Sequence, residues 1–501
     1  MSWRSARWLE VALLLAILAG AFWLDRANAD FALGLHVDEP RKAEAAQIGI
    51  PEYRHPHLLY HATRLAAAAT GAQSMQEVAE AGRLVSALFG TAVVFVSFLL
   101  FRRRFRPATA LAATALLAVT PILVVHSHYL KEDVCFTFAT TLAMLALLRF
   151  AHDRTPRALL GLGFATGLAM AAKYAGVVLF AIYLLLPLAA PVGSYRRWLR
   201  SLAGVAGVAL VVFAIVNAAG VGAPADLLAG ARGEGLHAVR GHDVPIWGPS
   251  YGFAFHLLWS LVPGLGVAAT LLALAGIVAA AWSRRRSRDD REERDDGVVL
   301  VAIAVLYLAI EVGPLKPFPN PMRYALPLAP LLIWFAAAGS EAFCARWLPR
   351  RTWAPAALLI AVAIGPAIRS QRLVADLASD TRFAAAERVR MLPGPVLLDD
   401  YSIASRWNPY PNLDLVYFFL RSPEEIARAR YAVTSSFRYE RYLAAANLPF
   451  QSDEIRAIAA RYRRLLACPD RQEFRPRRES FAFSNPVVVI VDLESCREEL
   501  R

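Results

Sequence analysis

The sequence has little charge for its length and few cysteines. Of its 501 residues only 19% are charged, 57% are hydrophobic and four are cysteines. Soluble globular domains carry about a quarter charged residues, so this composition argues against a wholly soluble protein. The cysteines have no metal-binding spacing, and no internal repeat is evident. What is present is long apolar runs, which predict a polytopic α-helical membrane protein with a polar appendage.

The first apolar run has no small-residue cleavage site directly after it, although Ala27-Asn28-Ala29 comes close. We therefore interpret it as a retained membrane helix. Since roughly 20 apolar residues cross a bilayer, we count about eleven spans. They lie near residues 8–25, 83–101, 108–126, 133–150, 158–173, 175–191, 201–219, 254–282, 298–312, 323–343 and 353–368.

Arginine clusters fall in alternate loops, which sets the expected orientation. Examples are Arg102-Arg103-Arg104 and Arg284-Arg285-Arg286, and such clusters are retained on the cytoplasmic side. Eleven spans then place the N-terminus in the cytoplasm and the chain after residue 368 outside. The expected location is a bacterial-type inner membrane. The external loops are 26–82, 127–132, 173–174, 220–253 and 313–322.

The formal net charge of +13 does not indicate nucleic-acid binding. The basic residues mark loop ends and the C-terminal part of the chain, and they form no single stripe with interleaved aromatic residues. The mixed run 283–296 is predicted to be a solvated loop.

After residue 368 the apolar runs stop and the pattern becomes mixed. A helix is expected over 381–390, and strands over 395–398, 431–434 and 486–493. We therefore predict two domains, a membrane domain 1–368 and an external α/β domain 369–501. Cys468 and Cys496 lie in the second domain, where an oxidising exterior would permit a disulfide, and the sequence leaves their pairing open.

Carboxylates occur directly beside membrane spans in two external loops. Asp38 and Glu39 follow the first span, and Asp133 precedes the fourth. A charge at bilayer depth costs roughly 2.5–3.5 kcal/mol, so it is kept only with a partner or a task. Two carboxylates from different loops can converge to deprotonate and orient an incoming hydroxyl group. Cations that fit a phosphate headgroup also lie at membrane edges: Lys131, Lys173 and Arg323.

Five ordered motifs resemble the GT-C superfamily of polyprenyl-phosphate-sugar-dependent glycosyltransferases, in its protein O-mannosyltransferase and aminoarabinose-transferase-like branch. The motifs are Asp38-Glu39 with Arg41 and Glu44, the stretch Arg54 to Tyr60, His128 to Asp133 with Thr137-Phe138, Gly167 to Tyr174, and Arg323-Tyr324 with Leu326-Pro327. The resemblance covers roughly residues 5–340. His57 and Glu132 depart from it, since each stands where the family commonly has proline.

The resemblance implies an inverting transfer of a sugar from a polyprenyl-phosphate donor to an acceptor hydroxyl at the external face of the membrane. Asp38 would be the general base, Glu39 would shape the site or hold the acceptor, and Asp133 would assist in positioning it. The expected partners are the lipid-linked donor, the bilayer, and a lipid, glycan or protein acceptor, and no cofactor is implied. Expected donor-phosphate ligands are Arg41, Lys131, Lys173 and Arg323, and expected acceptor contacts are Glu44, His55, Tyr60, His237 and His242.

Each prediction has a plainer alternative. Asp38, Glu39 or Asp133 could cap a helix N-terminus, and Lys173 and Arg323 could be snorkelling interface residues. The loop histidines could bind a divalent metal, although loop histidines more often form hydrogen bonds. A multi-span transporter or lipid flippase is the competing class, but it predicts ionisable groups near mid-membrane and symmetric halves. Here the carboxylates lie at one face.

Overall fold

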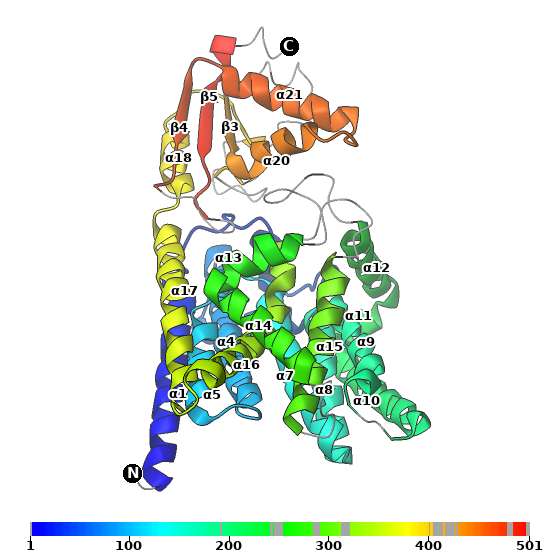
Figure 1. Ribbon diagram of the computed structural model, residues 1–501. Coiled ribbons are helices and arrows are strands. Elements are labelled where there is room, and N and C mark those ends of the chain that lie inside the picture. The colour runs from blue at the N-terminus through cyan, green and yellow to red at the C-terminus, as the bar shows by residue number, and fades with distance from the viewer. Residues whose placement is uncertain are drawn as a thin grey trace.

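The computed structural model describes residues 3–190, 193–240, 244, 254–283, 291–311, 321–399, 401–403, 414–415, 426, 429–477 and 484–496. A bundle of helices forms the larger part of the molecule, and a small α/β unit stands above it at the end opposite the N-terminus (Figure 1).

The first half of the bundle contains two long helices, α4 and α7, at its centre. The bounds are α1 (Trp3–Arg26), α2 (Glu39–Ile48), α3 (Leu58–Thr70), α4 (Met75–Phe101), α5 (Pro107–Ala118), α6 (Pro121–Ser127), α7 (Glu132–Asp153), α8 (Pro156–Ala172), η1 (Tyr174–Val178), α9 (Leu179–Leu185) and η2 (Leu186–Leu188).

The second half completes the bundle and leads toward the α/β unit. Its bounds are α10 (Tyr195–Val216), α11 (Ala218–Gly222), α12 (Pro224–Arg240), η3 (His256–Leu261), α13 (Val262–Leu265), α14 (Val267–Ser283), α15 (Arg291–Glu311), η4 (Met322–Leu328), α16 (Ala329–Trp347) and α17 (Ala354–Ala378).

The predicted class, a helical membrane protein with a C-terminal α/β domain, is confirmed. Among the described residues, six helices are long and apolar enough to cross a membrane, or up to eight if each of two bent pairs is one span. The remaining predicted spans fall on the shorter apolar helices 156–172 and 174–188 and on α15. The count of eleven crossings stays a prediction.

Two predicted spans are not straight helices. The segment 108–126 bends by 54° between α5 and α6, and the segment 254–282 bends by 115° between the helical stretch His256–Leu265 and α14. The second bend occurs at Gly266, whose φ of 92° is readily reached only by glycine. Hydropathy averages over a window, so it does not register such a bend.

Small residues allow a close contact between two helices of the bundle. A Cβ at Gly276 of α14 would lie 1.9 Å from the carbonyl oxygen of Phe335, and one at Gly339 of α16 would lie 2.1 Å from that of Leu272. Small residues let helix backbones approach in this way within membranes. The two glycines therefore allow α14 to pack directly on the buried helix α16.

The prediction of a solvated loop over 283–296 is wrong for its described part. Helix α15 begins at Arg291, and Asp295 and Asp296 are buried. His152 Nε2 lies 2.8 Å from Asp295, and the indole N–H of Trp334 donates to Asp296 at 2.7 Å. These partners come from α7 and α16, so the local charge pattern could not reveal them. Residues 284–290 lie outside the described part of the chain.

The C-terminal unit contains a five-stranded mixed sheet in the order β2-β1-β3-β5-β4. Its strands are β1 (Val396–Leu398), β2 (Asp414–Leu415), β3 (Tyr431–Ser435), β4 (Arg471–Phe474) and β5 (Val488–Asp492). The three predicted strands correspond to β1, β3 and β5, and the predicted helix is α18 (Thr381–Arg390). Helix α17 continues past residue 368 to Ala378, and the domain boundary at 368 stays a prediction.

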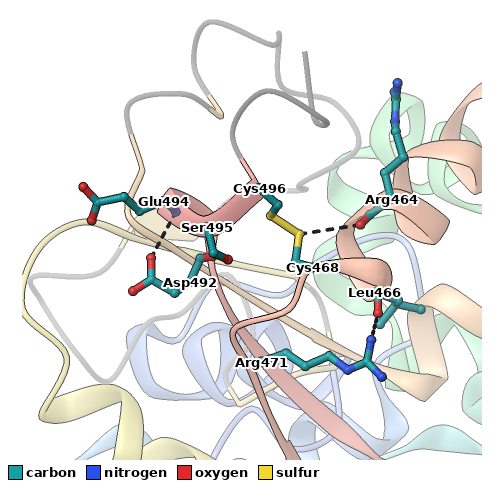
Figure 2. Close-up of a disulfide and its surroundings, with 8 residues drawn as sticks. All are labelled: Arg464, Leu466, Cys468, Arg471, Asp492, Glu494, Ser495 and Cys496. Carbon is teal, nitrogen blue, oxygen red and sulfur yellow. Dashed lines mark hydrogen bonds between the residues drawn. A yellow bond between two sulfur atoms is a disulfide. The ribbon is translucent and has the colours of Figure 1, made fainter.

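The sheet is covered by α20 (Ser436–Ala446) and α21 (Asp453–Ala467), whose apolar faces share one core with it. Cys468 follows α21 and forms a disulfide with Cys496 in the short helix η6 (Leu493–Cys496) (Figure 2). The sequence left open whether these two cysteines pair, and the structure shows that they do. The disulfide ties α21 to the end of the sheet.

Candidate active site

A buried ion pair lies at the centre of the loops around Asp38. The Glu39 carboxylate and the Arg83 guanidinium are both fully buried, with Nη2–Oε2 and Nε–Oε1 distances of 2.6 and 3.0 Å. The guanidinium also donates to the carbonyl oxygens of Ala29 and Phe31, at 3.0 and 2.5 Å. Glu39 accepts a further hydrogen bond, 2.9 Å long, from the backbone N–H of Leu130. The pair therefore joins α4, α2, the loop before α2 and the turn before α7.

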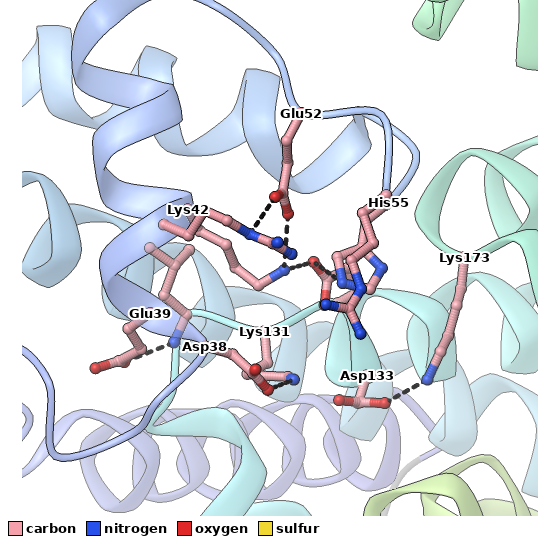
Figure 3. A network of polar contacts seen from close by, with 12 residues as sticks. Asp38, Glu39, Lys42, Glu52, His55, Lys131, Asp133 and Lys173 are labelled. Carbon is pink, nitrogen blue, oxygen red and sulfur yellow. Dashed lines mark hydrogen bonds and ion pairs between the residues drawn. The ribbon is translucent and has the colours of Figure 1, made fainter. Parts of the chain in front are cut away.

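Glu39 and Leu130, whose N–H donates to it, each adjoin a residue of the predicted site. Asp38 precedes Glu39, and Lys131 follows Leu130. Lys131 donates to the Asp38 carboxylate, and Arg323 Nη2 lies 3.7 Å from it. Figure 3 shows Asp38 pointing toward Lys131, while Glu39 points to the other side. Asp38 stands at the N-cap position of α2 but makes no side-chain capping bond, so the capping alternative does not describe its side chain.

Asp133 lies deeper than Asp38 and shares a cation with it. Its carboxylate accepts from Lys173 Nζ at 2.8 Å and lies 3.3 Å from Arg323 Nε. The Asp133 side chain is 3% exposed, whereas that of Asp38 is 40% exposed. Lys173 also lies over the ring of Tyr324, 4.0 Å from its centroid. Three cations thus surround two carboxylates, and of these carboxylates Asp38 is the accessible one.

The cations set the ionisation of Asp38. Burial by itself raises the pKa of this carboxyl, but Lys131, His36 and Arg323 outweigh burial and hold the pKa well below its usual range. His36 also accepts the backbone N–H of Asp38 at its ring nitrogen Nδ1, at 3.3 Å. Asp38 is therefore ionised at neutral pH.

A second group of charges lies next to the first. Arg41 and Lys42 of α2 both pair with Glu52, and Lys42 also donates to Glu132 (Figure 3). His55 Nε2 lies 3.9 Å from Glu132. Burial, together with the nearby Lys42, lowers the pKa of His55 well below its usual range despite Glu132, so its imidazole is neutral.

A cavity of about 30 Å³ opens beside this second group. His55 and Tyr60 line it, as do the charged groups of Lys42, Glu52 and Glu132 and the ring of His57. A space of this size admits one or two groups as large as water. Two predicted acceptor residues, His55 and Tyr60, thus line one small cavity.

Comparison with known proteins agrees with this architecture. Residues 55–219 match the family model described as dolichyl-phosphate-mannose-protein mannosyltransferase. The apo oligosaccharyltransferase of Archaeoglobus fulgidus has 14% identity and a TM-score of 0.60, over 92% of this chain and 73% of that chain. ArnT from Cupriavidus metallidurans, solved bound to undecaprenyl phosphate, has 16% identity and a TM-score of 0.55 over 98% of both chains. The chain therefore shares the fold of these membrane glycosyltransferases.

A further structural match is the Archaeoglobus fulgidus enzyme AglB in complex with an inhibitory peptide and a dolichol-phosphate. It has 14% identity and a TM-score of 0.58, over 92% of this chain and 73% of that chain. No curated protein sequence gives a significant match.

The structure brings only part of the predicted site together. Asp38, Asp133, Lys131, Lys173 and Arg323 form one cluster, whereas Arg41 pairs with Glu52 in the neighbouring group. The Glu39 carboxylate forms its ion pair with Arg83 and not with a cation of this cluster. The catalytic roles of all these residues stay predictions.

The predicted acceptor residues are spread more widely. Glu44 is half-buried on α2 and makes no hydrogen bond or ion pair with a described residue. His237 lies on α12, the helix whose Glu234 accepts from Arg54 of the first loop at 2.5 Å. His242 lies outside the described residues. Within the described part of the chain, no three His, Cys, Asp or Glu residues are grouped to hold a metal ion.

Arg83 is the main residue that the sequence analysis did not select. It sits at the start of the second predicted span, where a charge requires a partner, and that rule could have pointed to a nearby carboxylate. Glu52 had no such signal, because it lies in a polar loop where a carboxylate needs no partner.

The Glu39–Arg83 pair predicts which of the two adjacent carboxylates stabilises the fold. Glu39→Gln should leave the Arg83 charge buried without its anion and lower the free energy of unfolding by about 3–5 kcal/mol. The measurement is the midpoint of thermal unfolding in detergent. Glu44→Gln serves as the control and should unfold near the wild-type temperature. Asp38→Asn should lower the midpoint less than Glu39→Gln does, because the Asp38 side chain is 40% exposed. A Glu39→Gln midpoint equal to that of Asp38→Asn or of the control would contradict this assignment.

Proposed function

We propose that this chain transfers a sugar from a polyprenyl-phosphate donor to an acceptor hydroxyl group, with inversion at the sugar carbon and Asp38 as the general base. The observation that carries the proposal is the cluster of Lys131, Lys173 and Arg323 around Asp38 and Asp133. Its formal surplus is one positive charge, which suits an anionic donor. The bound undecaprenyl phosphate of ArnT and the dolichol-phosphate of AglB support a donor of this class.

Exposure assigns different roles to the two carboxylates. A general base must come within hydrogen-bond reach of the proton that it takes. Asp38 is partly exposed, whereas Asp133 is buried and engaged by Lys173 and Arg323. We therefore assign Asp38 to the acceptor proton and Asp133 to holding the cations in place.

The transfer itself is a single displacement. Asp38 takes the proton of the acceptor hydroxyl, whose oxygen forms a bond to the anomeric carbon on the face opposite the phosphate. The bond from that carbon to the phosphate oxygen breaks, and the lipid phosphate leaves with the electron pair. One displacement inverts the carbon. Lys131 and Arg323 stabilise the charge that develops on the leaving phosphate.

The same cations also control the pKa of Asp38. In the absence of donor they hold Asp38 ionised and weakly basic. A donor phosphate that engages Lys131 or Arg323 shares their charge, so the pKa of Asp38 rises toward a value suited to proton transfer. Donor binding would thus prepare the base for the acceptor.

The acceptor is proposed to enter beside α3. The small cavity there is lined by His55 and Tyr60 and also by Lys42 and Glu132, so its polar groups include both donors and acceptors for a hydroxyl-bearing group. The reaction is proposed at the external face of a bacterial-type inner membrane, with the N-terminus in the cytoplasm, because arginine clusters mark the opposite loops.

Asp38→Asn should reduce transfer by roughly 10²–10⁴-fold, because an amide cannot take the acceptor proton. The measurement is mass analysis of envelope glycolipids and glycoproteins from cells that contain the wild type, no copy, or the variant. The glycan lost without the chain identifies the product and should also be lost with Asp38→Asn. The matched control is Asp30→Asn, an exposed residue of the same loop, which should retain the product. Normal product with Asp38→Asn would eliminate the proposed base.

Removing Lys131 should change the pH dependence of turnover. The depressed pKa keeps Asp38 ionised as the pH falls well below the ordinary range of aspartate. Lys131→Met removes a stabilising cation, so the pKa rises and kcat at saturating donor should decline at a higher pH than in the wild type. Lys42→Met, which removes a cation paired with Glu52 and Glu132, is the control. Superimposable acid limits for Lys131→Met and wild type would disprove the coupling.

Thiol labelling of intact cells tests the orientation. Cys135 and Cys344 are buried and the other two cysteines are paired, so an introduced thiol should dominate labelling. Gln73→Cys, before α4, should react with an impermeant reagent in intact cells, and Arg350→Cys, after α16, only after permeabilisation. The reverse pattern would invert the proposed orientation.

A further inference from the structure

The loop that carries Asp38, residues 27–38 between α1 and α2, is held from two sides. From the bundle, Arg83 donates to the carbonyl oxygens of Ala29 and Phe31. From the C-terminal unit, Arg382 of α18 donates through Nη1 to the carbonyl oxygen of Leu35 at 2.6 Å. Two arginines from distant parts of the chain thus bind one backbone segment, which we call the Asp38 loop.

The Arg382 side chain is buried and bound within the C-terminal unit. It is 2% exposed, and its Nε and Nη2 pair with the two oxygens of Asp380 at 2.8 and 2.7 Å. Asp380 in turn accepts the backbone N–H of Asn485 at 2.7 Å, and the Asn485 side chain accepts the N–H of Thr381 at 2.9 Å. The position of the guanidinium is therefore fixed by both α18 and the segment that leads into β5.

The geometry of this contact requires arginine. A planar guanidinium presents a fork of donors to a carboxylate and still has a further N–H for a second acceptor. Arg382 uses the fork on Asp380 and the remaining nitrogen on Leu35. A lysine ammonium could pair with Asp380 but is a single point of charge, so it could not keep both contacts in the same geometry.

The bound carbonyl lies one residue before the groups that orient Asp38. The next residue, His36, accepts the backbone N–H of Asp38 at its ring and that of Glu39 at its carbonyl oxygen, at 3.3 and 3.1 Å. The His36 ring packs on Tyr129, with centroids 4.7 Å apart. A rotation of the peptide after Leu35 would therefore carry His36 and the Asp38 side chain with it.

We propose that Arg382 is a positioning residue for the reaction, through which the C-terminal unit fixes the Asp38 loop in its productive geometry. This inference rests on the proposed role of Asp38. It gives the α/β unit a part in catalysis without a residue of its own at the reacting atoms.

The test uses the full chain in detergent with a spin label at Ala32→Cys, an exposed position of the Asp38 loop. The variant is Asp380→Asn with Arg382→Gln, because the double change leaves no unpaired buried charge and asparagine still caps α18. We expect a more mobile label and a kcat lower by roughly a hundredfold, as for a displaced catalytic group, with KM for the donor within about threefold of wild type. Arg388→Gln, on the same helix, removes a surface side chain that donates to Gln472 and should change neither readout.

An unchanged label spectrum or an unchanged kcat in the folded double variant would overturn the inference. Arg382→Lys provides a second variant that keeps a cation beside Asp380, and its label should also become more mobile. If the wild-type chain transfers no sugar, the proposed function fails, while the label still decides whether Arg382 holds the loop.

Discussion

The geometry of the candidate site depends on one buried ion pair, Glu39 with Arg83. Both side chains are removed from solvent, where an unpaired charge would cost several kcal/mol, so each fixes the other. Because Asp38 adjoins Glu39 and Lys131 adjoins Leu130, which donates to Glu39, the same pair sets the distance between the proposed base and its closest cation. The site is thus organised by a contact that is itself out of reach of any substrate.

The three carboxylates of the region show how burial separates chemically identical groups. Glu39 is fully buried and bound bidentately by arginine, which suits a structural link. Asp133 is nearly buried between Lys173 and Arg323, which suits a group that holds cations in place. Asp38 keeps 40% of its side chain exposed and is the one of the three that a substrate could reach. A base with a depressed pKa is a poor base until its cations are drawn elsewhere, which links the donor and acceptor steps through charge alone.

The sequence was sufficient for the class of fold and for the residues that converge. Membrane-length runs, the break at Lys173 and the strands of the C-terminal unit follow from local periodicity. The count of spans and loops predicted Asp38, Asp133 and three cations at one face. The contacts that the sequence did not predict join residues that are far apart in the chain. The partner of Glu39 lies 44 residues away on α4, and Arg41 is diverted to Glu52 by the path of the first loop. The bends in two spans and the burial of Asp295 also depend on tertiary packing, which residue spacing does not encode.

The same reasoning explains why the C-terminal unit carries no recognisable motif. Every residue has a main-chain carbonyl oxygen. A side chain that donates a hydrogen bond to such an oxygen therefore requires no particular residue type at the accepting position, and the sequence does not reveal the contact. Leu35 contributes only its carbonyl oxygen to Arg382. The informative feature is on the other side of the contact, where an aspartate stands two residues before an arginine at the start of a helix and both are buried. Each member of this pair also bonds a further group: Asp380 accepts the backbone N–H of Asn485, and Arg382 donates to a main-chain carbonyl oxygen outside its own unit. That carbonyl oxygen belongs to the loop of the proposed base.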